Sequence, residues 1–198
     1  MNPAQASPFT FDVADGWCFG WFHPPAQPGR DLAIVMCPPI GYEAICSHPT
    51  YVQLARHFSA AGFPVLRSDH PATGDSSAND SRPARVEAWL AGIEAAVAQA
   101  RECSGATHVA LFGLRLGATL AVEAAARLGG VDSLLLWAPC AGGKAFAREM
   151  RASGTELEDG TLLAFGQPFT AETLRGLQAL AATRPARRAA GRPAAIVR

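Results

Sequence analysis

HVALFGLRLGATLAVEAA, residues 108–125, is the stretch of this chain that decides the fold. It begins as a short apolar strand and continues as an apolar helix. At the junction Gly113 and Gly117 flank Arg115, and two glycines so placed let the helix pass closely over the strand from which it emerges. We therefore expect Arg115 in a strained backbone conformation at a sharp strand-to-helix turn. The turn lacks the Gly-Lys-Ser/Thr of a phosphate-binding loop and the G-x-G start of a dinucleotide fingerprint.

Outward from this turn, predicted strands and helices alternate along the chain. The predicted strands are Leu32–Cys37, Phe63–Asp69, Val109–Phe112 and Val131–Ala138, and the predicted helices are Pro49–Ala61, Ser81–Cys103 and Leu116–Leu128. Right-handed crossovers between such elements predict the α/β class, with a mostly parallel sheet and helices on both of its faces. At the N-terminus, Phe9–Val13 and Trp17–Phe22 flank an Ala-Asp-Gly turn and predict a β-hairpin.

The length of 198 residues and the apolar fraction of 49% predict one domain, which we assign to residues 1–183. Its later part is less regular, and residues 154–182 predict a cap-like hairpin and helix. Residues 184–198 are rich in Arg, Pro and Ala, and we expect a solvated, disordered tail. Within this tail only Ala194–Val197 has the pattern that could start another strand.

Composition excludes several classes of function. Basic and acidic residues balance at 17 each, although residues after Glu172 carry six Arg and no acid, so a nucleic-acid partner is not expected. Five cysteines without a C-x-x-C pair indicate neither a disulfide framework nor a zinc site, and we predict no metal and no cofactor. The sequence shows neither a signal peptide nor a membrane span, so we predict a cytoplasmic protein.

Three motifs, in order, carry a resemblance to a known family: PPIGYE at residues 38–43, DHPATGDS at 69–76 and FGLRLGATLA at 112–121. In this order and spacing the chain resembles the α/β-hydrolase superfamily. It is most similar to the serine-aminopeptidase-like bacterial branch, which includes hydrolases associated with exosortase and exopolysaccharide clusters. The resemblance implies that PPIGYE is the oxyanion-hole loop and that Arg115 stands at the tip of the nucleophile elbow. It also implies an ester, peptide or acyl hydrolase.

The departures from the family pattern concern the catalytic triad. The family places Ser where this chain has Arg115, and a guanidinium has no lone pair with which to attack. The family's acid and His follow the nucleophile, whereas all five histidines here precede Arg115 (His23, His48, His57, His70, His108). We therefore expect a pseudoenzyme, truncated before the last strands of the fold, without a working Ser-His-Asp triad.

Other residues could supply a different chemistry. Cys37 and Cys140 end predicted strands, and either thiol could pair with His70 or His48, although buried Cys is more often a small apolar side chain. The same loop carries two serines and two aspartates, which more often form turns and backbone hydrogen bonds than perform catalysis (Ser76, Ser77, Asp69, Asp75).

Arg115 itself has two interpretations. It could bond an acid or a carbonyl and simply fix the turn. It could instead form a binding site with Leu116, Ile40 and Gly41 for a small anionic or acyl ligand, since a helix N-terminus favours anions.

Three hypotheses follow for the whole chain: a hydrolase by descent that uses other residues or a longer chain, a non-catalytic binding or accessory protein, and a truncated, poorly stable product of a once longer gene. We separately expect self-association through the sheet edge that the end of the chain leaves uncovered.

Overall fold

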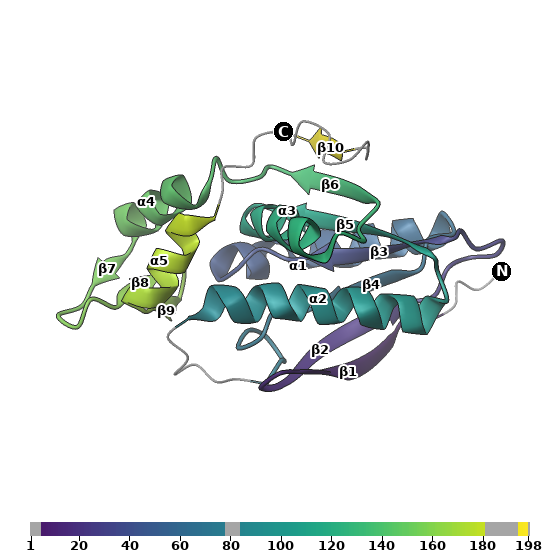
Figure 1. Cartoon of the computed structure of the whole chain (residues 1–198), viewed down its shortest axis with the longest axis horizontal. Coiled ribbons are helices and arrows are strands. Elements are labelled where there is room, and N and C mark those ends of the chain that lie inside the picture. The colour runs from purple at the N-terminus through teal and green to yellow at the C-terminus, as the bar shows by residue number, and fades with distance from the viewer. Residues whose placement is uncertain (1–4, 78–83, 181–193, 198) are drawn as a thin grey trace.

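The computed structural model describes residues 5–77, 84–180 and 194–197, and within them a seven-stranded sheet forms the centre of the molecule (Figure 1). In spatial order its strands are β1 (Ser7–Val13), β2 (Gly16–His23), β4 (Val65–Ser68), β3 (Leu32–Cys37), β5 (His108–Leu114), β6 (Ser133–Trp137) and β10 (Ala194–Val197). Strands β3, β4, β5 and β6 are parallel neighbours, which confirms the predicted α/β class. Strands β1 and β2 form the predicted antiparallel hairpin.

Strand β5 lies in the middle of the sheet, between β3 and β6. Its register places Leu32 opposite His108 on one side and Leu114 opposite Trp137 on the other. Residues 109–113 of β5 are all buried, as a strand covered on both faces requires. The turn that follows β5 therefore opens at the carboxyl edge of the sheet, where ligands bind in α/β proteins.

Three long helices cover the two faces of the sheet: α1 (Tyr42–Ala60), α2 (Arg85–Ser104) and α3 (Leu116–Leu128). Helices α2 and α3 pack side by side on one face, and α1 covers the other face (Figure 1). Trp89 of α2 and Leu120 of α3 are completely buried in the larger core. Tyr51 and Ala55 of α1 belong to a second core, together with Phe112 of β5.

Helix α1 begins at Tyr42, so the prediction that it begins at Pro49 was wrong. Proline lacks an N–H group and favours the first turn of a helix, which is why it suggested a helix start. In the structure Pro49 lies inside the helix and removes one backbone hydrogen bond. The helix starts instead at Gly41, whose φ of 66° lets its carbonyl accept from the N–H groups of Ala44 and Ile45.

Residues 143–180, which we call the C-terminal segment, form a compact unit at one end of the sheet (Figure 1). It consists of α4 (Gly143–Ser153), β7 (Thr155–Glu156), β8 (Leu162–Ala164), β9 (Gln167–Phe169) and α5 (Ala171–Ala179). The antiparallel pair of β8 and β9 is the hairpin that the sequence predicted. Thr170 caps α5 through its hydroxyl oxygen, which accepts from the N–H of Thr173 at 3.1 Å.

The predicted tail falls mostly outside the described residues, since 181–193 and 198 are not among them. Ala194–Val197 is the exception and forms β10, in parallel register with β6. Self-association through a sheet edge stays a prediction. Among the described residues, no helix combines the length and the apolar character needed to cross a bilayer.

Candidate functional site

The turn between β5 and α3 has the strained geometry that its two glycines predict. Arg115 adopts φ 53° and ψ −120° at the start of α3, and its N–H donates to the carbonyl of Trp137 at 3.0 Å. A Cβ atom at Gly113 would overlap the backbone of Ala118, and one at Gly117 would overlap the carbonyl of Cys37. Only glycine therefore fits at either position, because strand and helix pass within backbone contact of each other.

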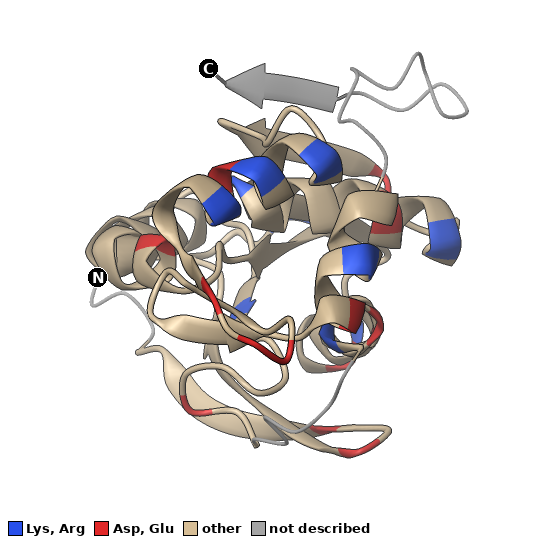
Figure 2. Ribbon diagram, turned by 90° about the vertical axis from the view of Figure 1, so that its left-hand side faces the viewer, with Lys and Arg blue, Asp and Glu red and all other residues tan. Residues whose placement is uncertain are grey.

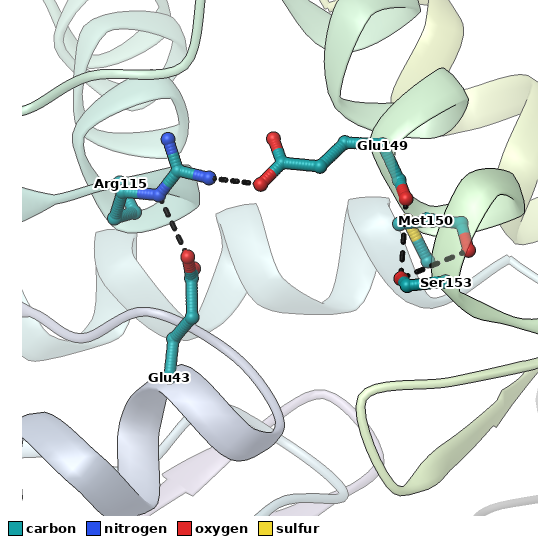
Figure 3. A network of polar contacts seen from close by, with 5 residues as sticks. All are labelled: Glu43, Arg115, Glu149, Met150 and Ser153. Carbon is teal, nitrogen blue, oxygen red and sulfur yellow. Dashed lines mark hydrogen bonds and ion pairs between the residues drawn. The ribbon is translucent and has the colours of Figure 1, made fainter.

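The guanidinium of Arg115 lies between two carboxylates from different helices (Figure 3). Its Nε donates to Oε1 of Glu43 on α1 at 2.7 Å, and its Nη2 donates to Oε1 of Glu149 on α4 at 2.6 Å. The side chains of Arg115 and Glu43 are 27% and 28% exposed, and that of Glu149 is 50% exposed. Arg115 thus joins the turn after the central strand to the C-terminal segment.

Burial of Arg115 acts to lower its pKa, but the hydrogen bond that it donates to Glu43 and the negative charges around it outweigh burial, and the pKa is raised. The guanidinium therefore stays charged and cannot accept a proton. Because two carboxylates flank one cation, the cluster of Arg115, Glu43 and Glu149 carries an excess of negative charge.

The loop after β3 lies directly under the C-terminal segment. The N–H of Tyr42 donates to the carbonyl of Phe165 at 3.0 Å. A Cβ atom at Gly41 would come within 2.7 Å of that same carbonyl oxygen, so glycine is required for this close approach. The turn between β8 and β9, which contains Phe165, is therefore seated on the loop.

An open groove of about 870 Å³ runs between this loop, the start of α1 and the C-terminal segment. Its walls are Pro39, Ile40, Gly41, Tyr42, Ala44, Ile45, His48, Pro49, Asp69, Thr73, Gly74, Asp75, Ser153, Phe165, Gly166 and Gln167. Tyr42 and Ile45 are 64% and 72% exposed although they are large and apolar. A cavity of this size with an apolar wall and a few polar groups is typical of a small-molecule site.

The loop after β4 is braced by its own side chains and by β2. Oδ2 of Asp69 accepts from the N–H of Asp75 at 3.0 Å, and the hydroxyl of Ser76 donates to the carbonyl of Asp69 and accepts from the N–H of Phe19. Ser77 bonds both backbone groups of Trp17 at 2.8 Å. The hydroxyl groups of Ser76 and Ser77 are therefore engaged in holding the loop to β2.

Ala72 in this loop adopts a φ of 59°, the left-handed conformation that glycine would favour.

Comparison with solved structures places this geometry in a known fold. A serine hydrolase without a lid from Xanthomonas campestris aligns with a TM-score of 0.59 and 22% identity, over 72% of this chain and 65% of that protein. A hypothetical protein from Pseudomonas aeruginosa aligns with a TM-score of 0.72 and 14% identity, over 99% of this chain and 78% of its own. An α/β hydrolase from a Penicillium species gives a TM-score of 0.66 and 20% identity, over 88% and 73% of the two chains.

The chain has the α/β-hydrolase fold. No family model and no curated protein sequence matches it. The matched region spans less than two thirds of the Xanthomonas hydrolase. The turn after the central strand carries Arg115 at its tip.

The residues that the sequence singled out for binding are partly brought together. Ile40 and Gly41 line the groove, Leu116 is completely buried, and Arg115 lies outside the groove wall between its two carboxylates. Sequence analysis missed Tyr42, Ile45 and Phe165. Tyr42 and Ile45 belong to the first turn of α1. A prediction that began this helix at Tyr42 instead of Pro49 would have placed both residues beside the loop after β3.

The candidate thiols are buried and protonated at neutral pH. Burial raises the pKa of Cys37 to about 12, and burial together with the neighbouring carboxylates raises that of Cys140 to about 12 against the opposing effect of Arg115. His70 is buried with its Nε2 3.0 Å from the carbonyl of Pro38, and burial lowers its pKa to about 4. Neither thiol is therefore prepared as a thiolate nucleophile.

No group of three or more His, Cys, Asp and Glu side chains in the described part of the chain is arranged to hold a metal ion.

Proposed function

We propose that this chain is a non-catalytic binding protein on the α/β-hydrolase fold, and that its groove receives the acyl or alkyl group of a small ligand. The observation that carries the proposal is Arg115 at the tip of the elbow, with its guanidinium bonded to Glu43 and Glu149. In a serine hydrolase of this fold, that position presents the attacking hydroxyl. Here it presents a cation already committed to two carboxylates.

The loop after β3 supports the same proposal. In the fold this loop supplies an N–H group to the oxyanion that forms during acyl transfer. In this chain the N–H of Tyr42 donates to the carbonyl of Phe165, so the C-terminal segment uses a donor from the loop. Arg115 then serves as a pin that holds α4 beside the loop and so sets one wall of the groove.

The apolar wall of the groove supports an acyl or alkyl ligand. Ile40, Tyr42, Ile45 and Phe165 offer contact area to a hydrocarbon chain, and each methylene removed from water contributes about 0.8 kcal/mol. Arg115 does not add an anion site in our proposal, because its charge is already more than balanced by Glu43 and Glu149.

A second candidate is an ester, peptide or acyl hydrolase of the serine-aminopeptidase-like branch that acts through other residues. The likeness to serine hydrolases of the same fold, together with the motifs at residues 38–43, 69–76 and 112–121, favours it.

A fluorophosphonate probe and a panel of short-chain esters separate the two candidates. We expect no labelled serine and no ester turnover, while octan-1-ol and longer alkanols bind with an affinity that rises with chain length. The variant Ile45→Gln should weaken alkanol binding without unfolding the protein, because the side chain is 72% exposed. The matched control Gln53→Ala lies on the same helix, outside the groove. Rapid labelling of a serine would overturn the proposal. An alkanol affinity that is unchanged in Ile45→Gln would also overturn it.

A further inference from the structure

A second, smaller cavity adjoins the groove and shares part of its wall. Ala44, His48, Asp69 and Asp75 belong to the walls of both. Beyond them lies a recess of about 90 Å³, whose remaining walls are Phe19, Gly20, Trp21, Pro38, Ser47, Tyr51, Arg67 and Ser68. That volume equals about three water molecules at roughly 30 Å³ each, which is the size of a small polar head group. We call this recess, whose wall contains both aromatic and charged side chains, the chamber.

The chamber carries more negative than positive charge. Asp69 and Asp75 are both in its wall, and, among the described residues, Arg67 is the single Lys or Arg in the walls of either cavity. The guanidinium of Arg67 is already engaged, since its Nε donates to Nε2 of His23 at 3.2 Å and its centre lies 5.6 Å from the ring of Trp21. The Arg67 side chain is thus already held by His23 and Trp21.

Asp69 is the more buried of the two carboxylates in the chamber wall. Burial raises its pKa, and the opposing effects of the Asp75 N–H, Arg67 and His48 do not restore it. A cation near Asp69 would stabilise the ionised carboxylate, whereas an anion would add a third negative charge to the same space. Phe19, Trp21 and Tyr51 also contribute to the chamber wall, and the Trp21 ring already contacts one cation, the guanidinium of Arg67. In the described part of the chain, basic residues lie mainly on the helices, and acidic ones recur along the loops and the N-terminal hairpin (Figure 2).

We infer that the ligand of the groove is a cationic amphiphile, with its hydrocarbon chain along Ile40, Tyr42, Ile45 and Phe165 and an ammonium head group in the chamber beside Asp69 and Asp75. The inference rests on the proposed function, because it names the head group of the ligand that the groove is proposed to bind. The head group inferred here is an ammonium. A carboxylate or phosphate would instead be expected if Arg115 were free to bind an anion.

Three probes of equal chain length test the inference: octylamine, octan-1-ol and octanoate, each titrated below its aggregation concentration at pH 7. We expect octylamine to bind about fivefold more tightly than octan-1-ol, and octanoate to bind more weakly than octan-1-ol, as for a partly exposed ion pair. Added salt should shrink the amine preference, because it screens charges near the surface.

The variant Asp75→Asn tests the source of the preference. Asp75 is exposed, so its substitution leaves the core intact, and the ratio of octylamine to octan-1-ol affinity should fall toward one. Asp12→Asn makes the same change of charge on an exposed residue of β1, in neither cavity wall, and should leave that ratio as it is.

The possible outcomes separate the two proposals. If octan-1-ol binds but octylamine shows no preference, or if Asp75→Asn keeps the preference, the ammonium inference fails and the proposed function stands. If octanoate binds most tightly, the ammonium inference also fails. If none of the three probes binds, the proposed function fails and the inference falls with it.

Discussion

Nη2 of Arg115 lies 2.6 Å from Oε1 of Glu149, and this ion pair connects the turn after the central strand with helix α4. A second ion pair, from Nε of the same side chain to Glu43, adds helix α1 to the connection. Further along α4, the hydroxyl of Ser153 donates to the carbonyl of Glu149 at 3.1 Å, and Ser153 itself lines the groove (Figure 3). Arg115 is thus connected, through Glu149 of α4, to a wall of the proposed binding site.

Removing one partner of this connection should loosen the C-terminal segment. In Glu149→Gln the charge is lost and the exposed ion pair weakens, so we expect the free energy of unfolding to fall by less than about 1 kcal/mol. Amide hydrogen exchange should nevertheless rise in residues 155–169, because these strands follow α4 directly. The control Glu123→Gln breaks a comparable surface pair with Arg127 on α3 and should leave that exchange unchanged. Equal exchange in the two variants would contradict the role assigned to Arg115.

The elbow should not regain activity when a serine is supplied. Arg115→Ser restores the hydroxyl but leaves Glu43 and Glu149 without their cation, and it places no base beside the new hydroxyl. We expect no ester turnover and no fluorophosphonate labelling at position 115, together with a lower melting temperature. Arg115→Lys, which keeps the charge but not the two-pronged geometry, should recover part of the lost stability. Covalent labelling of the introduced serine would show that the surrounding residues still form a catalytic site.

The glycines of the elbow should be intolerant of any side chain. Gly117→Ala puts a methyl group into the carbonyl groups of Cys37 and Pro38, so strand β3 and helix α3 would have to separate. We expect a loss of about 3 kcal/mol or more in the free energy of unfolding, measured by denaturant titration. Gly130→Ala provides the matched control, since the nearest atom to a Cβ there is 3.6 Å away. A change of similar size in both variants would count against backbone contact at the elbow.

Acid should destabilise the fold through its buried histidines. Burial lowers the pKa of His70 to about 4, and burial together with Arg67 lowers that of His23 to about 4, whereas both protonate near pH 6.5 in the unfolded chain. Between these values the unfolded state binds more protons, so stability decreases as the pH falls from 6.5 toward 4. Each histidine contributes at most about 3 kcal/mol to this loss.

His70→Gln tests this dependence. The amide can still donate to the carbonyl of Pro38, so the variant should fold and show a flatter decrease of stability between pH 6.5 and pH 4. His57→Gln, at an exposed position of α1, should keep the slope of the unchanged protein. An unaltered slope in His70→Gln would show that this imidazole is already charged in the folded state.

Much of the fold is determined by local sequence patterns. The apolar run Leu32–Cys37 predicted β3 with the bounds that the structure has. Gly113 and Gly117 predicted the strained turn at Arg115. These features depend on backbone conformation and on burial of neighbouring residues, so a short window of sequence contains their physical cause.

The start of α1 and the surroundings of Arg115 were decided only by the tertiary structure. The partners of Arg115 are 72 residues earlier and 34 residues later in the chain, and the N–H of Tyr42 bonds a carbonyl of the distant β8–β9 turn. The sequence could show that residue 115 is a cation, but not that two carboxylates would meet it. Such contacts form where elements from separate parts of the chain pack together, and no periodicity within one segment specifies which distant side chains will arrive there.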